Sequence, residues 1–347
     1  MPDAKVALPK PIPYTGSLDK YDSFEVTPYI GSEFSDLQLT DLIDAENADE
    51  LIRDLAVLVS QRGVVFFRNQ NIDDDKQRIL GTKLGQLTGK PKESTLHVHP
   101  TEAPSSETGE EILVLQPNQG INKNQELLKK ITSRASRGWH TDITFEKVPS
   151  DYAVLKILSP PTGGGGDTLW ASGYHAYEKL TPTFRAFLET LTAHHSGEYF
   201  KTVAAASGHG IVEHERGHPL NKGDNLQADH PVVRTNPVTG WKSIYVNPIF
   251  TQSINGLNFD ESKNLLDYLN QSLIENHDAH VRFRWNANDV AIWDNRSTYH
   301  TATNDYTAPD REGHRVLSIG EIPYFDPNSV GIFEALEKNL EKLEVKE

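Results

Sequence analysis

Short apolar segments recur along the chain, and they restrict its possible folds more than any other feature. Gly63–Phe67, Tyr152–Leu158 and Asp289–Asp294 are rich in β-branched, aromatic or other apolar residues, and each is followed by a polar residue. Segments of this length and composition are typical of buried β-strands. Helical stretches lie between such segments, but without the regular alternation of a Rossmann or TIM architecture. We therefore predict a single, mainly β domain with a β-sandwich core and flanking helices.

The spacing of apolar residues also predicts the remaining elements and the division of the chain. Further strands are expected over Glu111–Gln116, His280–Trp285 and Arg315–Ile319, and a hairpin around Asn236–Gly240. Helices are expected over Asn47–Gln61, Asp73–Leu84 and Asp260–Asn276, and from Thr181 to about Ala193. Residues 1–30 are expected to form an extended arm, residues 31–330 the domain, and residues 331–347 a C-terminal helix. The apolar stripe of that last helix would pack on the body or on a second subunit.

The charge and the residue usage exclude several classes of function. The formal net charge is −15 at pH 7 and the pI is about 5.4, which argues against nucleic-acid and anionic-membrane partners. A small anionic substrate stays compatible, because a local arginine cluster can outweigh distant surface charge. The chain has no cysteine, so thiolate metal sites and thiol nucleophiles are excluded. It also lacks an apolar leader and a long apolar run, and we therefore expect a cytoplasmic protein.

The segment His140-Thr141-Asp142 places an imidazole and a carboxylate two residues apart. In an extended strand, residues i and i+2 point to the same face, so both groups could bind one ion. One histidine and one carboxylate are two of the three ligands of a facial Fe(II) site. The segment alone is a weak indication, since most such pairs are surface polar residues.

His300 is the candidate for the missing ligand. It follows the predicted strand Asp289–Asp294, where side chains can reach a cleft. Arg311 and Arg315 come next, and in a strand both would point to the same face. Two guanidinium groups in a pocket bind carboxylate, sulfonate or phosphate through forked hydrogen bonds. A zinc hydrolase could also use two histidines and an aspartate, and a non-catalytic binding protein is a further alternative.

Several short motifs, in this order, resemble those of one family. They are Trp139–Asp142, Gly166–Trp170, His230–Arg234, Tyr245–Asn247, Asp289–Arg296, and His300 with Arg311 and Arg315. Over roughly residues 60–320 the chain resembles the taurine/alkylsulfonate dioxygenases, which are Fe(II)- and 2-oxoglutarate-dependent oxygenases. The resemblance implies a double-stranded β-helix (jelly-roll, cupin-like) core and the use of O₂.

The resemblance also implies roles for individual residues. It assigns Fe(II) to His140, Asp142 and His300, and the distal carboxylate of 2-oxoglutarate to Thr168 and Arg311. In this family a histidine before a proline and the last arginine of the motif hold a sulfonate. His99 and Arg315 stand in those places, and Ile143, Phe200 and Phe250 are candidates for an apolar wall.

Two positions depart from the family pattern. Glu102 stands where a tyrosine is expected, and Ser136 stands where an asparagine is expected at a substrate-binding position. Both positions help to bind the amino end of taurine in the family, so taurine itself is put in doubt more than a sulfonate is.

The resemblance thus implies hydroxylation of a small anionic substrate. The leading candidate is an alkylsulfonate, hydroxylated at the carbon next to sulfur with release of sulfite and an aldehyde. The alternative is the same chemistry on a sulfate ester, a carboxylate or a secondary metabolite. Relatives are often dimers or tetramers, so a homodimer or homotetramer is implied as well.

Overall fold

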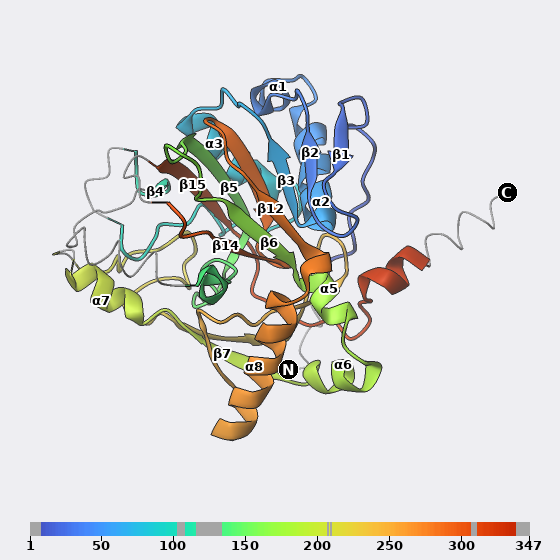
Figure 1. The fold of residues 1–347 in the computed structure, drawn as a ribbon, viewed down its shortest axis with the longest axis vertical. Helices are drawn as coiled ribbons and strands as arrows, with labels where there is room; N and C mark the ends of the chain where they lie inside the picture. The colour runs from blue at the N-terminus through green and yellow to red at the C-terminus, as the bar shows by residue number, and fades with distance from the viewer. Residues whose placement is uncertain are drawn as a thin grey trace.

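The computed structural model describes residues 8–102, 108–115, 134–206, 208, 210–306 and 311–337. Its main feature is a seven-stranded sheet that lies between a layer of helices and a smaller sheet (Figure 1). In sheet order the strands are β1 (Ser23–Glu25), β2 (Ser32–Phe34), β3 (Val64–Phe67), β13 (Asp289–Asp294), β5 (Ser150–Ser159), β15 (Glu312–Ile319) and β4 (Leu113–Leu115). Neighbours are antiparallel except β2 and β3. The predicted strands at β3, β5, β13 and β15 are therefore confirmed, and β4 lies inside the predicted range.

Helices cover the outer face of the large sheet. They are α1 (Leu39–Ile43), α2 (Ala48–Arg62) and α3 (Asp74–Gln86), and the last two confirm their predicted ranges to within two residues. Asp73 caps α3 by accepting a hydrogen bond from the backbone of Lys76. Buried leucine, isoleucine and valine side chains of α2 and α3 pack against Val65, Phe67 and Val154 of the sheet. Burial of this apolar stripe stabilises the helices more than their intrinsic propensity does.

The inner face of the large sheet packs against a three-stranded sheet. Its order is β12 (His280–Phe283), β6 (Thr168–Ser172) and β14 (Thr298–Ala302). The rings of Phe66 and Phe283 stack across the interface with centroids 4.2 Å apart. Trp170 packs edge-on against Trp293 at 5.8 Å, so aromatic side chains fill the space between the sheets. The two facing sheets confirm the predicted sandwich with helices outside.

A second group of elements covers the other side of the small sheet. It contains α5 (Gly173–Glu178), α6 (Pro182–Leu188), β7 (Thr192–Ser196), α7 (Tyr199–Ala206), β8 (Gln227–Pro231), β9 (Val233–Thr235), β10 (Lys242–Ile244), β11 (Thr251–Ile254), α8 (Phe259–Ile274) and the 3₁₀ turn η2 (His277–Ala279). Leucines of α8 pack near Ala171 and Tyr299 of the small sheet. The strands β9 and β10 form the predicted hairpin, and α8 confirms its predicted helix.

The prediction for the helix that starts at Thr181 was wrong at its end. Thr181 and Pro182 do begin α6, but the helix stops at Leu188 and not near Ala193. Ala193 instead lies in β7, where it pairs with His230 of β8 and Ile254 of β11. Cross-strand pairing on both sides of β7 outweighs the local helical pattern there.

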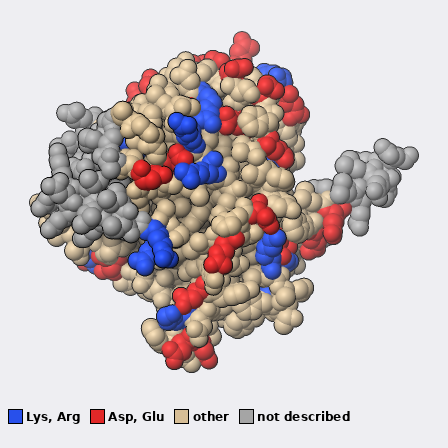
Figure 2. All heavy atoms as spheres, in the orientation of Figure 1, with Lys and Arg blue, Asp and Glu red and all other residues tan. Residues whose placement is uncertain are grey.

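Both ends of the described chain lie on the surface of the body. Near the N-terminus, Thr15 and Ser17 donate hydrogen bonds to the buried carboxylate of Asp54 in α2, and Leu18 is buried. At the other end residues 332–337 are helical, and the rest of the expected C-terminal helix lies outside the described residues. Among the described helices, none is both long and apolar enough to cross a membrane. On the face shown in Figure 2, lysine and arginine are interspersed with aspartate and glutamate.

Candidate metal centre

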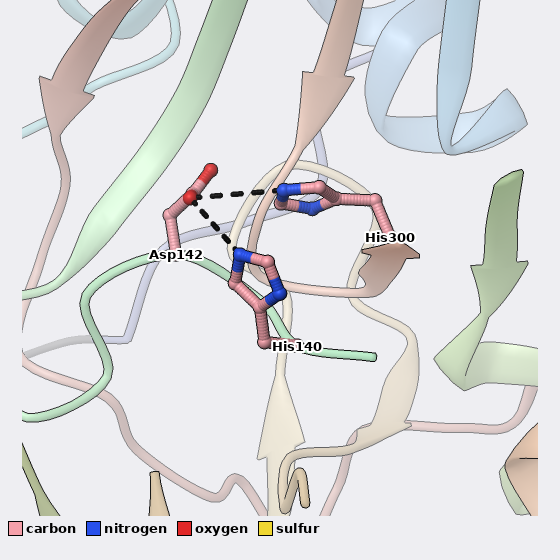
Figure 3. Close-up of side chains that lie close together, drawn as sticks. All are labelled: His140, Asp142 and His300. Atoms are coloured by element: carbon pink, nitrogen blue, oxygen red, sulfur yellow. Dashed lines mark ion pairs between the residues drawn. The ribbon is translucent and has the colours of Figure 1, made fainter. Parts of the chain in front are cut away.

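The structure brings His140, Asp142 and His300 together, as the sequence predicts. One ligand atom of each lies within 4.8 Å of the other two. The Oδ1 atom of Asp142 is 3.7 Å from Nε2 of His140 and 3.8 Å from Nε2 of His300 (Figure 3). Among the described residues this is the one such group of histidine and acidic side chains. Two imidazole nitrogens and a carboxylate oxygen suit Fe(II), and they leave coordination positions open for other ligands.

The conformation of the segment His140–Asp142 differs from the expectation. The segment does not form a strand. A 3₁₀ turn, η1 (Ala135–Gly138), precedes it, and a turn begins at Asp142. Only His140 is paired, through reciprocal backbone hydrogen bonds of 3.0 and 2.8 Å with His300 of β14. Ile143 then has a φ of +49°, a left-handed conformation that few residues other than glycine adopt. The two ligands converge because of these contacts and not because of a strand period.

The side chain of Asn295 explains why the segment keeps this conformation. Its Oδ1 atom accepts hydrogen bonds from the backbone N–H of Asp142 at 3.1 Å and from the indole N–H of Trp293 at 2.9 Å. The hydroxyl of Thr141 donates to the backbone carbonyl of Asn295 at 2.5 Å. In turn, the amide nitrogen of Asn295 donates to Ser150 at 3.0 Å. The sequence motif Asp289–Arg296 includes Asn295, but it gave no indication of this role.

Burial and nearby charge set the protonation states of the three candidate ligands. Burial lowers the pKa of His140, and it lowers the pKa of His300 to about 3, so both imidazoles are neutral. Burial alone would raise the pKa of Asp142, but the nearby charge of Arg315 outweighs it and, with the hydrogen bond to Asn295, holds the pKa at about 2. The carboxylate is therefore ionised at neutral pH. Neutral imidazole and ionised carboxylate are the protonation states that bind a metal ion.

A backbone carbonyl also selects the tautomer of His140. The carbonyl of Gly138 lies 2.7 Å from Nδ1 of His140 and can only accept, so Nδ1 carries the proton. The lone pair then lies on Nε2, the atom that faces Asp142. This arrangement, in which the second ring nitrogen of a ligand is bonded to a carbonyl, is usual for metal-binding histidines.

A pocket of about 230 Å³ opens beside the three ligands. Its lining combines two of the three ligands with two further polar side chains and an apolar wall: His99, Gly138, His140, Asp142, Ile143, Tyr199, Phe200, Ile249, Phe250 and Arg315. The predicted residues Ile143, Phe200 and Phe250 are among them. Ser136 lies in η1 and is not part of this lining. Tyr199 of α7 and Ile249, which precedes β11, were missed, because nothing local in the sequence connects either segment with the metal ligands.

Arg315 lines the pocket and contacts one of the metal ligands. Its Nη1 atom donates to Oδ1 of Asp142 at 2.8 Å, a contact that the sequence did not predict. Its Nε atom is buried and has no hydrogen-bond partner in the described part of the chain. The guanidinium therefore offers further donors to an anion while it holds Asp142.

His99 is a polar residue of the pocket lining, and its ring packs edge-on against Phe200 with centroids 4.9 Å apart. The backbone N–H of Thr101 donates to Nδ1 of His99 at 3.2 Å, so Nδ1 is an acceptor. Burial, with the neighbouring His97 and Arg315, lowers the pKa of His99 well below its ordinary value. A neutral ring that accepts at Nδ1 must carry its proton at Nε2. His99 is thus a neutral hydrogen-bond donor.

Thr168 and Arg311, the predicted co-substrate residues, are not part of the lining of this pocket. Thr168 of β6 pairs with Ala302 of β14, which lies two residues after His300. The side chains of Thr168 and His300 therefore share one face of the small sheet. Arg311 packs against Gly166, where an added Cβ atom would lie 3.2 Å from its Nε. Arg311 is 8% exposed, and its Nε has no hydrogen-bond partner within the described ranges. A buried guanidinium with a free donor is the kind of group that a carboxylate would neutralise.

Comparisons with known proteins agree with this chemistry. A family model described as "Taurine catabolism dioxygenase TauD, TfdA family" matches residues 22–317. The chain is 46% identical to the alpha-ketoglutarate-dependent dioxygenase btcD of Neocamarosporium betae, over 94% of this chain and 99% of the relative. It is 35% identical to an alpha-ketoglutarate-dependent sulfonate dioxygenase of Saccharomyces cerevisiae, over 87% of this chain and 68% of that protein. A taurine dioxygenase from Burkholderia xenovorans matches with a TM-score of 0.64 at 26% identity, over 89% of this chain and 92% of that chain.

The match to the family covers most of the chain, including His140, Asp142 and His300. Alpha-ketoglutarate (2-oxoglutarate)-dependent dioxygenases use Fe(II), 2-oxoglutarate and O₂, and the histidine–aspartate–histidine group has the chemistry that Fe(II) requires. The chain is therefore an alpha-ketoglutarate-dependent dioxygenase, and it belongs to the TauD, TfdA family.

Proposed function

We propose that this dioxygenase hydroxylates a small anionic substrate, with Fe(II) bound by His140, Asp142 and His300. The observation that carries the proposal is the position of Arg315, which lines the pocket and contacts Asp142 directly. An anion held by Arg315 would lie within a few ångströms of the metal ligands. The bound iron supplies the activation of O₂ when 2-oxoglutarate is present. Overall, 2-oxoglutarate, O₂ and a C–H bond give succinate, CO₂ and a hydroxylated product.

The protein's own contribution is to bind, orient and exclude water. Tyr199, Phe200 and Phe250 form an aromatic cluster, with ring centroids of Tyr199 and Phe200 4.2 Å apart and of Phe200 and Phe250 6.3 Å apart. Phe250 also lies edge-on to His140 at 6.0 Å. Apolar rings beside the ligands displace water and leave room for a carbon chain. The pocket thus suits a molecule with an anionic head and an apolar body.

For the co-substrate, we assign the distal carboxylate of 2-oxoglutarate to Arg311 and Thr168. Burial lowers the pKa of Arg311, which reflects the cost of holding a cation away from water. A carboxylate beside it would offset that cost through a charge-assisted hydrogen bond. Because Thr168 shares the face of β6 and β14 that carries His300, one small dicarboxylate could reach both the iron and this pair.

An alkylsulfonate is the substrate we propose first. A sulfonate accepts several hydrogen bonds, which matches the free donors of Arg315 and the neutral donor at Nε2 of His99. A relative named as a sulfonate dioxygenase supports this choice. Hydroxylation at the carbon next to sulfur gives an adduct that releases sulfite and leaves an aldehyde. The alternative is the same reaction on a sulfate ester, a carboxylate or a secondary metabolite.

Two structural features belong to the same proposal. The facing sheets are proposed to form the double-stranded β-helix of the family, and the enzyme is proposed to act as a homodimer or homotetramer. The helix of residues 332–337 supports the second point, because Phe333 and Leu336 are 40% and 47% exposed on its surface.

The decisive experiment measures O₂ uptake, succinate and sulfite with a panel of sulfonates, sulfate esters and carboxylates. We expect an alkylsulfonate to yield succinate and sulfite in equal amounts, and the His140→Ala variant to yield neither. Succinate formation with a carboxylate or sulfate ester, without sulfite from any sulfonate, would move the assignment to the alternative.

The variant Arg311→Ala tests the co-substrate site. Loss of the guanidinium removes a charge-assisted pair, so we expect the KM for 2-oxoglutarate to rise by about tenfold or more. The KM for the sulfonate should change little. The exposed Arg284 offers a matched control, and Arg284→Ala should leave both constants unchanged. An unaltered KM for 2-oxoglutarate in Arg311→Ala would remove Arg311 from this role.

A further inference from the structure

The indole of Trp285 makes one specific contact in the core. Its N–H donates to Oγ1 of Thr168 at 3.0 Å. Both side chains are buried, Trp285 at 4% and Thr168 at 3% exposure. An indole N–H can only donate, whereas a hydroxyl has one proton to give and two lone pairs that accept. The bond from Trp285 therefore occupies an acceptor site of Thr168 and leaves its proton free to donate to another group.

We propose that Trp285 is a positioning residue that presents the Thr168 hydroxyl as a donor to the carboxylate of 2-oxoglutarate. This inference rests on the proposed co-substrate site of Thr168 and Arg311. A carboxylate only accepts hydrogen bonds, so a hydroxyl beside it binds well only with its proton directed at it. Without the indole N–H, the threonine hydroxyl could rotate and donate to a nearby backbone carbonyl, as threonine often does.

The arrangement of the strands supports an effect of Trp285 on the Thr168 hydroxyl. Phe283 of β12 pairs with Thr168 of β6, and Trp285 lies two residues beyond Phe283, on the same side of the chain. On the other side of β6, Ala302 of β14 is opposite Thr168. The Thr168 side chain thus lies in a sheet whose face also carries His300. Arg311 packs against Gly166, two residues before Thr168, so the guanidinium lies near the same stretch of backbone.

A second tryptophan shows that burial alone does not impose such a bond. Trp170 lies on β6, two residues after Thr168, and is completely buried. Its indole N–H has no hydrogen-bond partner in the part of the chain that the structure describes. The same aromatic layer, with Trp170 and Trp285 centroids 6.2 Å apart, therefore holds one unpaired indole N–H and one that meets Thr168. Trp170 is accordingly a matched control for Trp285.

The test compares Trp285→Phe with Trp170→Phe, since both variants exchange an indole for a phenyl ring in the same layer. Binding of 2-oxoglutarate to zinc-loaded protein is measured by calorimetry, and the KM and kcat are measured with iron. We expect Trp285→Phe to weaken binding about 5- to 10-fold and to raise the KM for 2-oxoglutarate similarly, with kcat nearly unchanged. Trp170→Phe should change binding less than about twofold, because it removes no hydrogen bond.

A double-mutant cycle with Thr168→Val shows whether Trp285 acts through Thr168. If it does, Trp285→Phe has no further effect on 2-oxoglutarate binding once the hydroxyl is gone. Equal binding by Trp285→Phe and the unmodified protein would overturn the inference, and so would full additivity with Thr168→Val. If the unmodified protein does not bind 2-oxoglutarate, the co-substrate site itself fails, and this inference fails with it.

A measurement on the unmodified protein covers the case in which Trp285→Phe does not fold. Indole ¹⁵N–¹H resonances are recorded for the zinc-loaded protein before and after addition of 2-oxoglutarate. We expect the Trp285 resonance to shift, because the Thr168 hydroxyl that accepts its N–H then donates to the carboxylate of 2-oxoglutarate. The Trp170 resonance should stay nearly in place. A Trp285 resonance that does not move while 2-oxoglutarate binds would contradict the inference.

Discussion

Asn295 holds the backbone of the ligand segment from a position more than 150 residues away in the sequence. Its Oδ1 atom accepts from the N–H of Asp142, and its backbone carbonyl accepts from Thr141. Asn295 is completely buried, so removal of its side-chain amide would leave the backbone N–H of Asp142 and the indole N–H of Trp293 without this acceptor. Residues that orient metal ligands in this way typically change metal affinity 10- to 100-fold when they are replaced.

The variant Asn295→Leu should therefore bind a divalent metal about 10- to 100-fold more weakly, as measured by calorimetry with cobalt or manganese. Leucine has nearly the same shape as asparagine, so the loss reports the hydrogen bonds and not a cavity. The exposed Asn286 provides the control, and Asn286→Leu should leave metal affinity unchanged. Unchanged affinity in Asn295→Leu would mean that Asp142 is positioned by Arg315 and the turn alone.

The ion pair of Glu146 and Arg216 joins two segments next to the metal centre. Arg216 donates to both carboxylate oxygens of Glu146, at 2.6 and 3.0 Å, and both side chains are buried. It also donates to the carbonyls of Val212 and Gly223 at 2.7 and 2.9 Å. Since Glu146 follows Asp142 by one turn, the pair fixes the segment 212–223 against the turn that begins at a metal ligand.

Replacement of Arg216 by methionine would leave the buried carboxylate of Glu146 without its cation, with the His97 imidazole 3.5 Å away as the remaining neighbour. We expect Arg216→Met to lower the free energy of unfolding by about 3–5 kcal/mol, measured by urea denaturation. The double variant Glu146→Gln/Arg216→Met should recover part of this loss, because no charge is then left alone. At the exposed pair of Lys263 and Asp267, Lys263→Met should cost less than about 1 kcal/mol. A small effect of Arg216→Met alone would show that water reaches Glu146.

Elements with a regular apolar pattern were predictable, and contacts between distant segments were not. The ranges of α2 and α3 follow from the helical spacing of their apolar residues, and those of β3 and β13 from continuous apolar runs. In both cases neighbouring residues in the sequence show which side chains are buried. The segment His140–Asp142, whose ligand spacing would suit an extended strand, is a bridge followed by a turn. Its shape depends on Asn295, 153 residues from Asp142. The contact between Arg315 and Asp142 likewise joins residues 173 positions apart, which no local pattern encodes.

The molecule as a whole depends on the aromatic contact between the seven-stranded sheet and the small sheet of β12, β6 and β14. Phe283 of the small sheet stacks on Phe66 of the large sheet, with the Arg68 guanidinium 4.0 Å from the centre of the Phe283 ring. Trp285 lies 4.9 Å from the same ring, centroid to centroid. Because β6 and β14 in the small sheet carry Thr168 and His300, this contact also fixes the distance of these residues from the large sheet, which carries Arg315.

The variant Phe283→Ala should therefore weaken the whole fold and not one element. Loss of a buried phenyl ring typically costs about 3–5 kcal/mol in the free energy of unfolding, measured here by urea denaturation. Far-UV circular dichroism and tryptophan fluorescence should report the same midpoint, since the tryptophans between the sheets lose their packing when the strands separate. Phe259 is 80% exposed, and Phe259→Ala should change the free energy by less than about 0.5 kcal/mol. Separate midpoints for the two probes in Phe283→Ala would show instead that the small sheet unfolds independently of the large one.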